Sequence, residues 1–289
     1  MATNAGFSVT EVAAHASKAV ELLKAIVLGI VQGLTEFLPV SSSGHLVIGG
    51  QLLGFQEHGI FFEVCLHLGT LVAVFVVFRR DIAAMIQAPL QYVRGDRREQ
   101  VRQHLQWDLY VILATLPAVV VGLFFKEDIE GFFTSTLIAY SMLVVTGLMM
   151  ATARFLPQGD KPVNWWRSLV VGAAQAVAIM PGISRSGATI FAGMALGIDR
   201  EKVARFSFIM SIPAILGAAV LHLGDVLAHP PGEEALLNIG AGTVAAALSG
   251  YLAIRFLLFI IRRNQLEWFG YYCLLLAAAG LFHHFAIAG

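Results

Sequence analysis

The sequence predicts an all-α integral membrane protein with an inverted-topology repeat. Of its 289 residues, 57% are hydrophobic and only 13% are charged, and the mean hydropathy is +0.75. Soluble domains are roughly half apolar and one-quarter charged. The stretch GIVQGLTEFLPVSSSGHLVIGG returns 143 positions later as GAAQAVAIMPGISRSGATIFAG, with Gly44 aligned on Gly187. A formal net charge of zero argues against nucleic acid as a partner.

Five apolar segments follow one another in each half, and we expect one membrane domain over residues 1–289. Repeat one, about 22–153, has segments at 22–39, 45–54, 60–78, 107–125 and 134–153. Repeat two, about 165–287, has segments at 165–181, 187–198, 203–223, 238–261 and 268–287. The charged Lys18 and Lys24 before the first apolar run, and Glu36 within it, argue against a removable signal peptide.

The first two segments of each half are short, and a cluster of Pro, Ser and Gly separates them. Since a helix needs about 20 residues to cross the hydrocarbon core, we interpret each pair as re-entrant and the remaining segments as about six full spans. Irregular backbone survives at membrane depth only inside protein or beside water, so the two breaks are expected to face each other. Three spans per half make the second copy enter from the opposite side.

Basic residues mark one side of the membrane. The segment 79–106 carries six arginines, and segments 154–167 and 199–205 add further basic residues. The loops at 126–131 and 224–237 are acidic or nearly free of them. Because Lys and Arg favour cytoplasmic loops, we expect the arginine-rich side to face the cytoplasm and both termini to lie outside.

Polar chemistry gathers at the two breaks. Gln32 and Glu36 share one helix face, which runs into the hydroxyl-rich break Pro39-Val40-Ser41-Ser42-Ser43-Gly44-His45. An ionisable group inside the bilayer costs about 3 kcal/mol or more unless it is paired or hydrated. The plainer alternative is that Ser and Gly only allow close helix packing while Glu36 sits in a wet crevice.

The second break adds Arg185, flanked by Ser184 and Ser186. A guanidinium together with amide groups at the starts of the helices after Gly44 and Gly187 would cradle a phosphate. We expect a divalent cation to join Glu36 to phosphate oxygens. The alternative for Arg185 is that it only snorkels to the membrane surface.

The segments QGLTEFLPVSSSGHL and PGISRSGATI closely resemble the two signatures of the bacterial undecaprenyl pyrophosphate phosphatase family, also known as bacitracin resistance protein. FSFIMSIPAILGA at 206–218 extends the resemblance along the chain. The resemblance implies hydrolysis of undecaprenyl diphosphate to undecaprenyl phosphate and inorganic phosphate, which recycles the lipid carrier of peptidoglycan synthesis and confers bacitracin resistance. It also implies Mg or Ca as activating ion, and a multi-pass location in the bacterial inner membrane with the active site facing the periplasm.

The family's motifs assign roles to positions of this chain. The predicted catalytic residues are Glu36, Ser42, His45 and Arg185. The predicted substrate-binding residues are Ser41, Ser43, Gly44, Ser184, Arg185, Ser186 and Gly187. Glu36 and Gln32 are the predicted metal ligands; some members carry glutamate where this chain has Gln32, so Glu36 must supply the negative charge. Two routes stay open: Ser42 attacks the terminal phosphorus with His45 or Glu36 as base, or a water attacks directly.

A second function class is a transporter or flippase of an anionic lipid or solute, because broken helices in inverted repeats are the usual architecture of alternating access. The cluster of Ser42, Glu36 and His45 favours catalysis. The expected partners are a polyprenyl diphosphate and membrane lipid, and a homo-oligomer is left open. Glu63 and His67 share a helix face, and we expect a structural pair or a hydrated crevice there rather than a ligand site.

Overall fold

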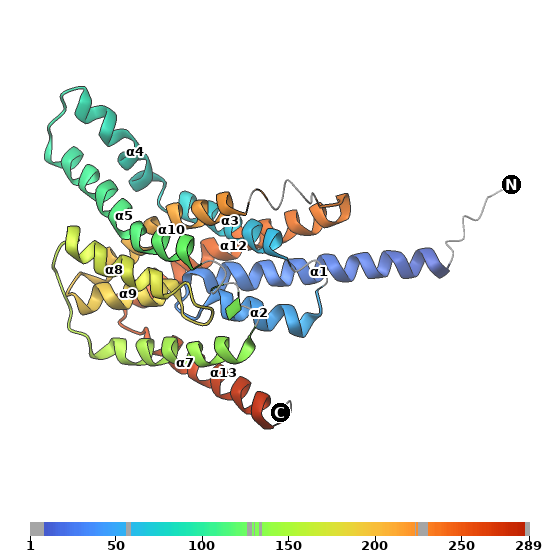
Figure 1. The fold of residues 1–289 in the computed structure, drawn as a ribbon. Coiled ribbons are helices and arrows are strands. Elements are labelled where there is room, and N and C mark those ends of the chain that lie inside the picture. Colours follow the sequence, from blue (N-terminus) through green and yellow to red (C-terminus); the bar gives the residue numbers. More distant parts are fainter. Residues whose placement is uncertain are drawn as a thin grey trace.

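The computed structural model describes residues 9–55, 59–125, 129, 131–132, 135–222, 224 and 231–286, and the regular elements within them are helices, apart from one isolated bridge between Lys161 and Ile198. The helices of the first half are α1 (Val9–Phe37), α2 (Ser42–Leu53), α3 (Ile60–Val77), α4 (Arg79–Val93), α5 (Glu99–Phe124) and α7 (Thr136–Thr152), with the short η1 (Ala153–Phe155). Those of the second half are α8 (Trp165–Val177), α9 (Arg185–Ala195), α10 (Arg200–Leu221), α12 (Glu233–Arg262) and α13 (Glu267–Ala286). Figure 1 shows their arrangement.

Five of these helices, α5, α7, α10, α12 and α13, are long and apolar enough to cross a membrane. The number becomes six if α3 and α4 form one span, although they meet at an angle of 82°. The expectation of about six spans therefore agrees with the described helices, and α3 is the segment on which the count depends.

Two segments differ from the expectation. Helix α1 has 29 residues and begins at Val9, not near 22, so the first segment is not short; Figure 1 shows it extending beyond the other helices. The arginine-rich segment 79–106 was expected as a loop but forms α4 and the first turns of α5. In α4 the buried residues Ile82, Met85 and Ala88 recur every third position, and the charged Arg79, Arg80 and Asp81 at its start hide this stripe from an averaged hydropathy.

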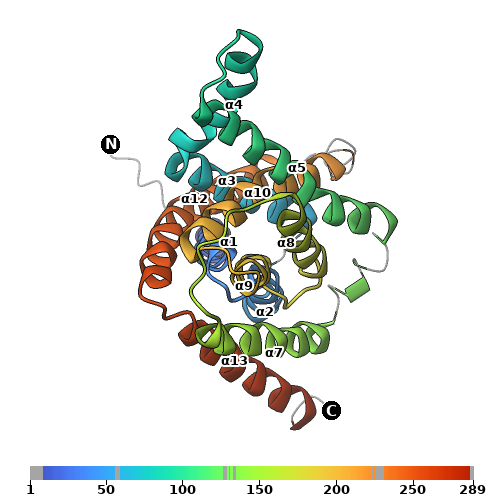
Figure 2. The same ribbon diagram turned by 90° about the vertical axis from the view of Figure 1, so that its left-hand side faces the viewer.

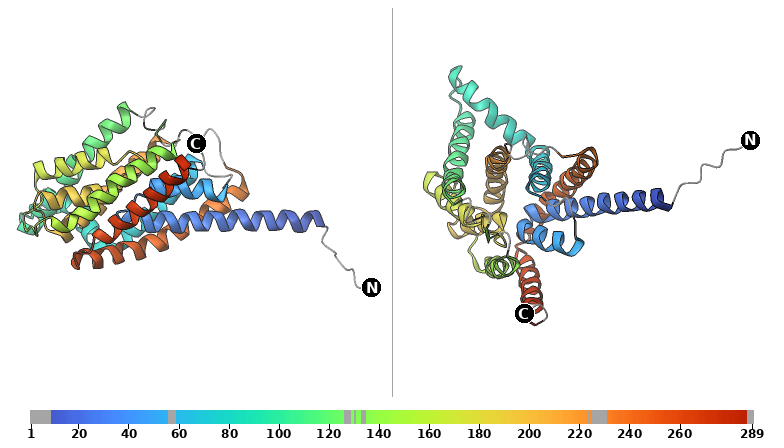
Figure 3. Two further views of the ribbon diagram at one scale, coloured as in Figure 1. Left: turned by 90° about the horizontal axis from the view of Figure 1, so that it is seen from below. Right: turned by 45° about the vertical axis from the view of Figure 1, so that its right-hand side comes forward.

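The two halves of the chain interlock. Helix α1 packs along α12, α5 along α8, and α7 along α13; the side-by-side course of α7 and α13 is visible in Figure 3. A Cβ on Gly29 would lie 2.2 Å from the carbonyl oxygen of Gly242, and a Cβ on Gly172 would lie 2.3 Å from that of Ala114. Gly29 and Gly172 are equivalent positions of the sequence repeat, so both copies use a missing side chain to approach a helix of the other half.

The two breaks lie against each other, as expected. Helices α2 and α9 overlap near the centre of the end-on view in Figure 2, whereas Figure 1 shows them one after the other along the bundle. A Cβ on Gly44 would lie 3.5 Å from the Cα of Gly182, and a Cβ on Gly187 would lie 3.2 Å from the Cβ of Pro39. Each break therefore packs on the other, and side chains distant in sequence meet there.

Candidate active site

Glu36 is the centre of the cluster that forms where the breaks meet. Its side chain is only 6% exposed. One carboxylate oxygen, Oε1, accepts a hydrogen bond of 2.6 Å from Nη2 of Arg185. The other, Oε2, accepts bonds from Ser42 Oγ at 2.8 Å and from Gln32 Nε2 at 3.0 Å. The residues predicted from the first break and from the second thus share one carboxylate.

Arg185 is held in a fixed orientation. It is the first residue of α9, and its Nη1 donates to the main-chain carbonyl of Ser207 in α10 at 3.2 Å, while Nη2 binds Glu36. Its side chain is 17% exposed. The guanidinium is therefore paired inside the protein, which argues against the snorkelling alternative.

His67 of α3 also reaches the cluster. Its Nε2 lies 3.5 Å from Oε2 of Glu36, and its Nδ1 lies 2.8 Å from the main-chain carbonyl of Glu63. The sequence suggested a structural pair between His67 and Glu63, and it gave no reason to connect His67 with Glu36. The one usable signal was an imidazole inside an otherwise apolar run, since such residues are rare in spans and mark functional sites.

His45 has different partners from those expected of a base for Ser42. Its Nδ1 lies 2.7 Å from the carbonyl of Ser41, and its Nε2 lies 2.7 Å from the hydroxyl of Tyr272, whose ring stacks on the imidazole at 5.6 Å. Because a carbonyl can only accept, the neutral imidazole carries its proton on Nδ1 and accepts from Tyr272 through Nε2. The structure brings Ser42 to Glu36 and not to His45.

The second break is fixed by hydroxyl groups. Ser184 is the N-cap of α9, and its Oγ accepts from the amide of Gly187 at 3.1 Å and lies 3.2 Å from Oγ of Ser186. Thr146 of α7 accepts from the Ser184 amide at 2.9 Å and donates to the carbonyl of Gly182 at 2.8 Å. Capping satisfies amides that a helix start would otherwise leave free.

The first break repeats this capping. Ser41 Oγ accepts from the amide of Gly44 at 3.3 Å and lies 3.2 Å from Oγ of Ser43. Both helices start earlier than predicted, at Ser42 and not at 45, and at Arg185 and not at 187, so the amides of Gly44 and Gly187 already have partners. The substrate-binding role of these serines and glycines stays a prediction, and any phosphate bound there would share the amides with the caps.

The side-chain oxygens of Glu36 and Gln32 suit a hard cation that takes only one or two of its ligands from the protein. Gln32 Oε1 is buried and has no hydrogen-bond partner among the described residues, although Nε2 of the same amide is bound to Glu36. Nowhere in the described ranges do three or more His, Cys, Asp or Glu side chains gather as for a closed metal site. Mg²⁺ typically takes one or two carboxylates and completes its shell with phosphate oxygens and water.

Proteins of one family are similar to this chain over most of its length. A family model described as bacitracin resistance protein BacA matches residues 25–279. A protein of Alkaliphilus metalliredigens named undecaprenyl-diphosphatase is 44% identical over 257 residues, which cover 86% of this chain and 94% of the relative. Proteins of the same name from Rubrobacter xylanophilus and Geobacter sulfurreducens are 44% and 41% identical, covering 89% and 92% of this chain and 96% and 99% of their own. The chain is thus a multi-pass membrane protein that belongs to the bacitracin resistance protein family.

Proposed function

We propose that the protein is an undecaprenyl-diphosphatase, which hydrolyses undecaprenyl diphosphate to undecaprenyl phosphate and inorganic phosphate, and so recycles the lipid carrier of peptidoglycan synthesis and confers bacitracin resistance. The observation that carries this proposal is the convergence of Arg185, Ser42 and Glu36 within hydrogen-bond distance. A phosphate-binding cation, a hydroxyl nucleophile and an acceptor for its proton are the groups that phosphoryl transfer requires. The shared name of the relatives supports the same substrate.

Substrate binding would change the partner of Arg185. In the present arrangement the guanidinium and the Glu36 carboxylate neutralise each other. A diphosphate offers several oxygens to the guanidinium in the bidentate geometry that arginine favours, so the phosphate would displace Glu36 from Arg185. The displaced carboxylate would keep its bonds to Ser42 and Gln32 and face the terminal phosphate.

Charge balance supports a divalent cation, Mg²⁺ or Ca²⁺. Glu36 and Arg185 together carry no net charge, whereas the diphosphate brings several negative charges into a buried site. Glu36 and the unpartnered Oε1 of Gln32 would hold the ion. When bound, it would withdraw charge from the phosphate oxygens as a Lewis acid.

In the proposed reaction, the terminal phosphorus gains a bond to an attacking oxygen and loses its bond to the bridging oxygen, which leaves on undecaprenyl phosphate. The attacking oxygen is Ser42 Oγ, whose proton passes to Glu36 across 2.8 Å, or a water in the same place. The serine route forms a phosphoserine that water then hydrolyses. Because phosphoryl transfer is mainly positioning and charge stabilisation, Arg185 contributes more than the strength of the base.

The proposal includes the topology. We infer that α1–α2 and α8–α9 are re-entrant pairs of an inverted repeat, with the site open to the periplasm. Equivalent caps at Ser41 and Ser184 and equivalent close contacts at Gly29 and Gly172 support the repeat. The basic residues gathered on α4 and at the start of α10 support an opposite, cytoplasmic position for that end of the bundle.

Phosphate release from farnesyl diphosphate by purified protein in detergent tests the function. We expect release with Mg²⁺ or Ca²⁺ and a loss of about 10²–10³-fold in Arg185→Lys, because a lysine keeps the charge but not the two-pronged contact. Ser42→Ala distinguishes the routes: loss of activity together with trapping of a phosphoserine in the parent supports the serine route. Ser141→Ala is the matched control, since within the described part of the chain the Ser141 hydroxyl bonds only the Leu137 carbonyl of its own helix. Absence of release from the parent protein would favour the transporter instead.

A further inference from the structure

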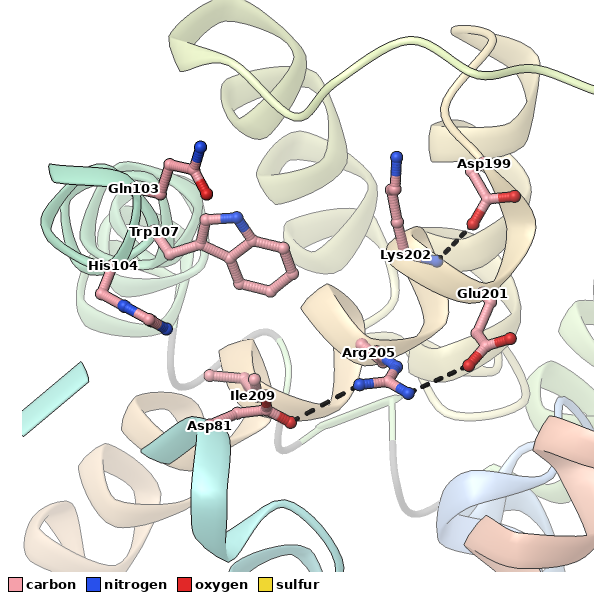
Figure 4. Close-up of a pocket in the computed structure, with 9 residues that line it drawn as sticks. All are labelled: Asp81, Gln103, His104, Trp107, Asp199, Glu201, Lys202, Arg205 and Ile209. Carbon is pink, nitrogen blue, oxygen red and sulfur yellow. Dashed lines mark hydrogen bonds and ion pairs between the residues drawn. The ribbon is translucent and has the colours of Figure 1, made fainter. Parts of the chain in front are cut away.

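A hollow lined by charged side chains lies away from the Glu36 cluster, between α4, α5 and α10. It has a volume of about 490 Å³, and its walls include Asp81, His104, Trp107, Lys202 and Arg205. Figure 4 shows these side chains pointing into a shared space. An adjoining hollow of about 380 Å³ shares Asp81 and Arg205 and adds Arg79 and Arg80. We call the two together the basic hollow.

The acidic residues of the basic hollow are largely occupied. Glu201 is bound by Arg262 through two bonds of 2.9 Å and by Arg205 at 3.0 Å. Asp199 caps α10 by accepting from the Lys202 amide at 2.9 Å. Asp81 has a looser contact, 3.7 Å, with Arg205. Each carboxylate therefore has a partner within the protein, although the neutral amide bonded to Asp199 leaves that negative charge in place.

Two cationic side chains of the basic hollow are not paired with another side chain among the described residues. Within the described residues, neither the Lys202 ammonium nor the Arg80 guanidinium has a hydrogen bond or an ion pair, and both side chains are exposed. Arg79 donates only to the Val76 carbonyl at 3.2 Å. The two hollows together are lined by four cations (Arg79, Arg80, Lys202 and Arg205) and three carboxylates, one of which also pairs with Arg262. This leaves a small surplus of positive charge, which suits a ligand with a negative group.

The position of α4 indicates where such a ligand comes from. Helix α4 turns 82° away from α3 at the corner that carries Arg79 and Arg80. It exposes Ile86, Leu90 and Val93, three large apolar side chains on one helix face, with 72%, 52% and 82% of each accessible. An amphipathic helix with an open apolar stripe lies in the membrane interface, so the hollow beside it lies at the depth of lipid headgroups.

We propose that the basic hollow binds the phosphate of a membrane glycerophospholipid. Lys202 and Arg80 contact the phosphate, and the acyl chains run along the exposed apolar face of α4. The volume suits a headgroup, since ligand pockets typically measure about 300–1,000 Å³. Basic pockets between helices are a usual means of recognising anionic headgroups. This lipid is not the substrate, because the hollow shares no residue with the Glu36 cluster.

Native mass spectrometry of the purified protein, titrated with phosphatidylglycerol in detergent, tests the proposal. At roughly 1 kcal/mol, or about fivefold, for each cation, the variant Lys202→Ala/Arg80→Ala should bind the lipid at least about tenfold more weakly than the parent. Arg94→Ala is the matched control, since Arg94 is exposed on the same basic segment but outside the hollow, and it should bind like the parent. Unchanged phosphatase activity and melting temperature would show that the double variant is folded.

Competition with glycerol 3-phosphate distinguishes a lipid headgroup from a soluble phosphate as the ligand of the basic hollow. Millimolar glycerol 3-phosphate should leave the bound lipid in place, because the apolar contacts of α4 add to the affinity. Equal lipid affinity of the parent and the double variant would overturn the proposal, and so would complete displacement by glycerol 3-phosphate, which would make the ligand a soluble anion. The readout is bound lipid mass, so it does not depend on whether the Glu36 cluster acts as a phosphatase.

Discussion

The ion pair between Glu36 and Arg185 should affect stability and activity differently. Removing both charges should restore much of the stability that is lost when one charge is removed, but it should not restore activity. Replacing Arg185 by Met removes the guanidinium but leaves the carboxylate of Glu36 in a site where only 6% of its side chain is exposed. Replacing Glu36 by Gln leaves the guanidinium without its anion. The double variant Glu36→Gln/Arg185→Met carries neither charge.

The expected loss in the free energy of unfolding follows from the distance and burial of the two charges. Unit charges about 4 Å apart attract by about 4 kcal/mol at an effective dielectric constant of 20. Breaking a buried pair by removal of one partner typically costs about 3–5 kcal/mol, because the other charge stays buried alone, whereas removal of both is often close to neutral. Ser42 and Gln32 still donate to Glu36 in Arg185→Met, so we expect about 3 kcal/mol for that variant and a recovery of about 2 kcal/mol in the double variant.

Chemical unfolding of the purified protein in a fixed detergent measures these free energies, with Arg263→Met, an exposed arginine, as the control. Phosphate release from farnesyl diphosphate is measured on the same samples. Stability should recover in the double variant while activity does not. If the double variant loses the sum of the free energies of unfolding lost by the two single variants, the side chains do not interact. The description of the site as a shared carboxylate would then be wrong.

Four further variants test packing and the site. Gly29→Ala should destabilise the protein by about 1–3 kcal/mol, since its Cβ would overlap the backbone of Gly242, whereas Gly122→Ala, where the new Cβ meets nothing within 4 Å, should be neutral or slightly stabilising in thermal melts. His67→Leu should lower phosphate release by about tenfold or more with little change in melting temperature, because it removes a contact to Glu36 at a side chain that is 31% exposed. His67→Gln, whose side-chain amide can donate to Glu36, should recover part of the lost rate; equal rates for the two variants would show that the contact is not used.

The local pattern of the chain was enough to predict much of the site. Periodicity places Gln32 and Glu36 on one face because residues four apart are neighbours on a helix. The 143-residue repeat aligns Ser41 with Ser184, and both serines cap a helix start. Burial of an ionisable group in an apolar run requires a partner. The sequence predicted that Arg185 and Glu36 reach the same phosphate, whereas in the structure the two side chains pair directly.

Other features depend on contacts between distant segments. Nothing near His67 in the sequence connects it with Glu36, and nothing near His45 indicates that Tyr272 occupies its Nε2. The choice between Glu36 and His45 as partner of Ser42 is a matter of side-chain direction at the break, which spacing alone leaves open. The helical form of α4 was missed because averaging over its arginines conceals the apolar stripe.

The sequence by itself determined that the chain lies in a membrane, that it is duplicated, and that the two copies carry complementary charges, because composition and short-range periodicity reflect the solvent and the helix repeat. Only the tertiary structure decided which side chains share the Glu36 carboxylate and where surplus basic residues meet an open hollow. Those outcomes depend on how α1, α3, α9 and α10 are placed against one another, and close packing fixes that placement over the whole chain at once.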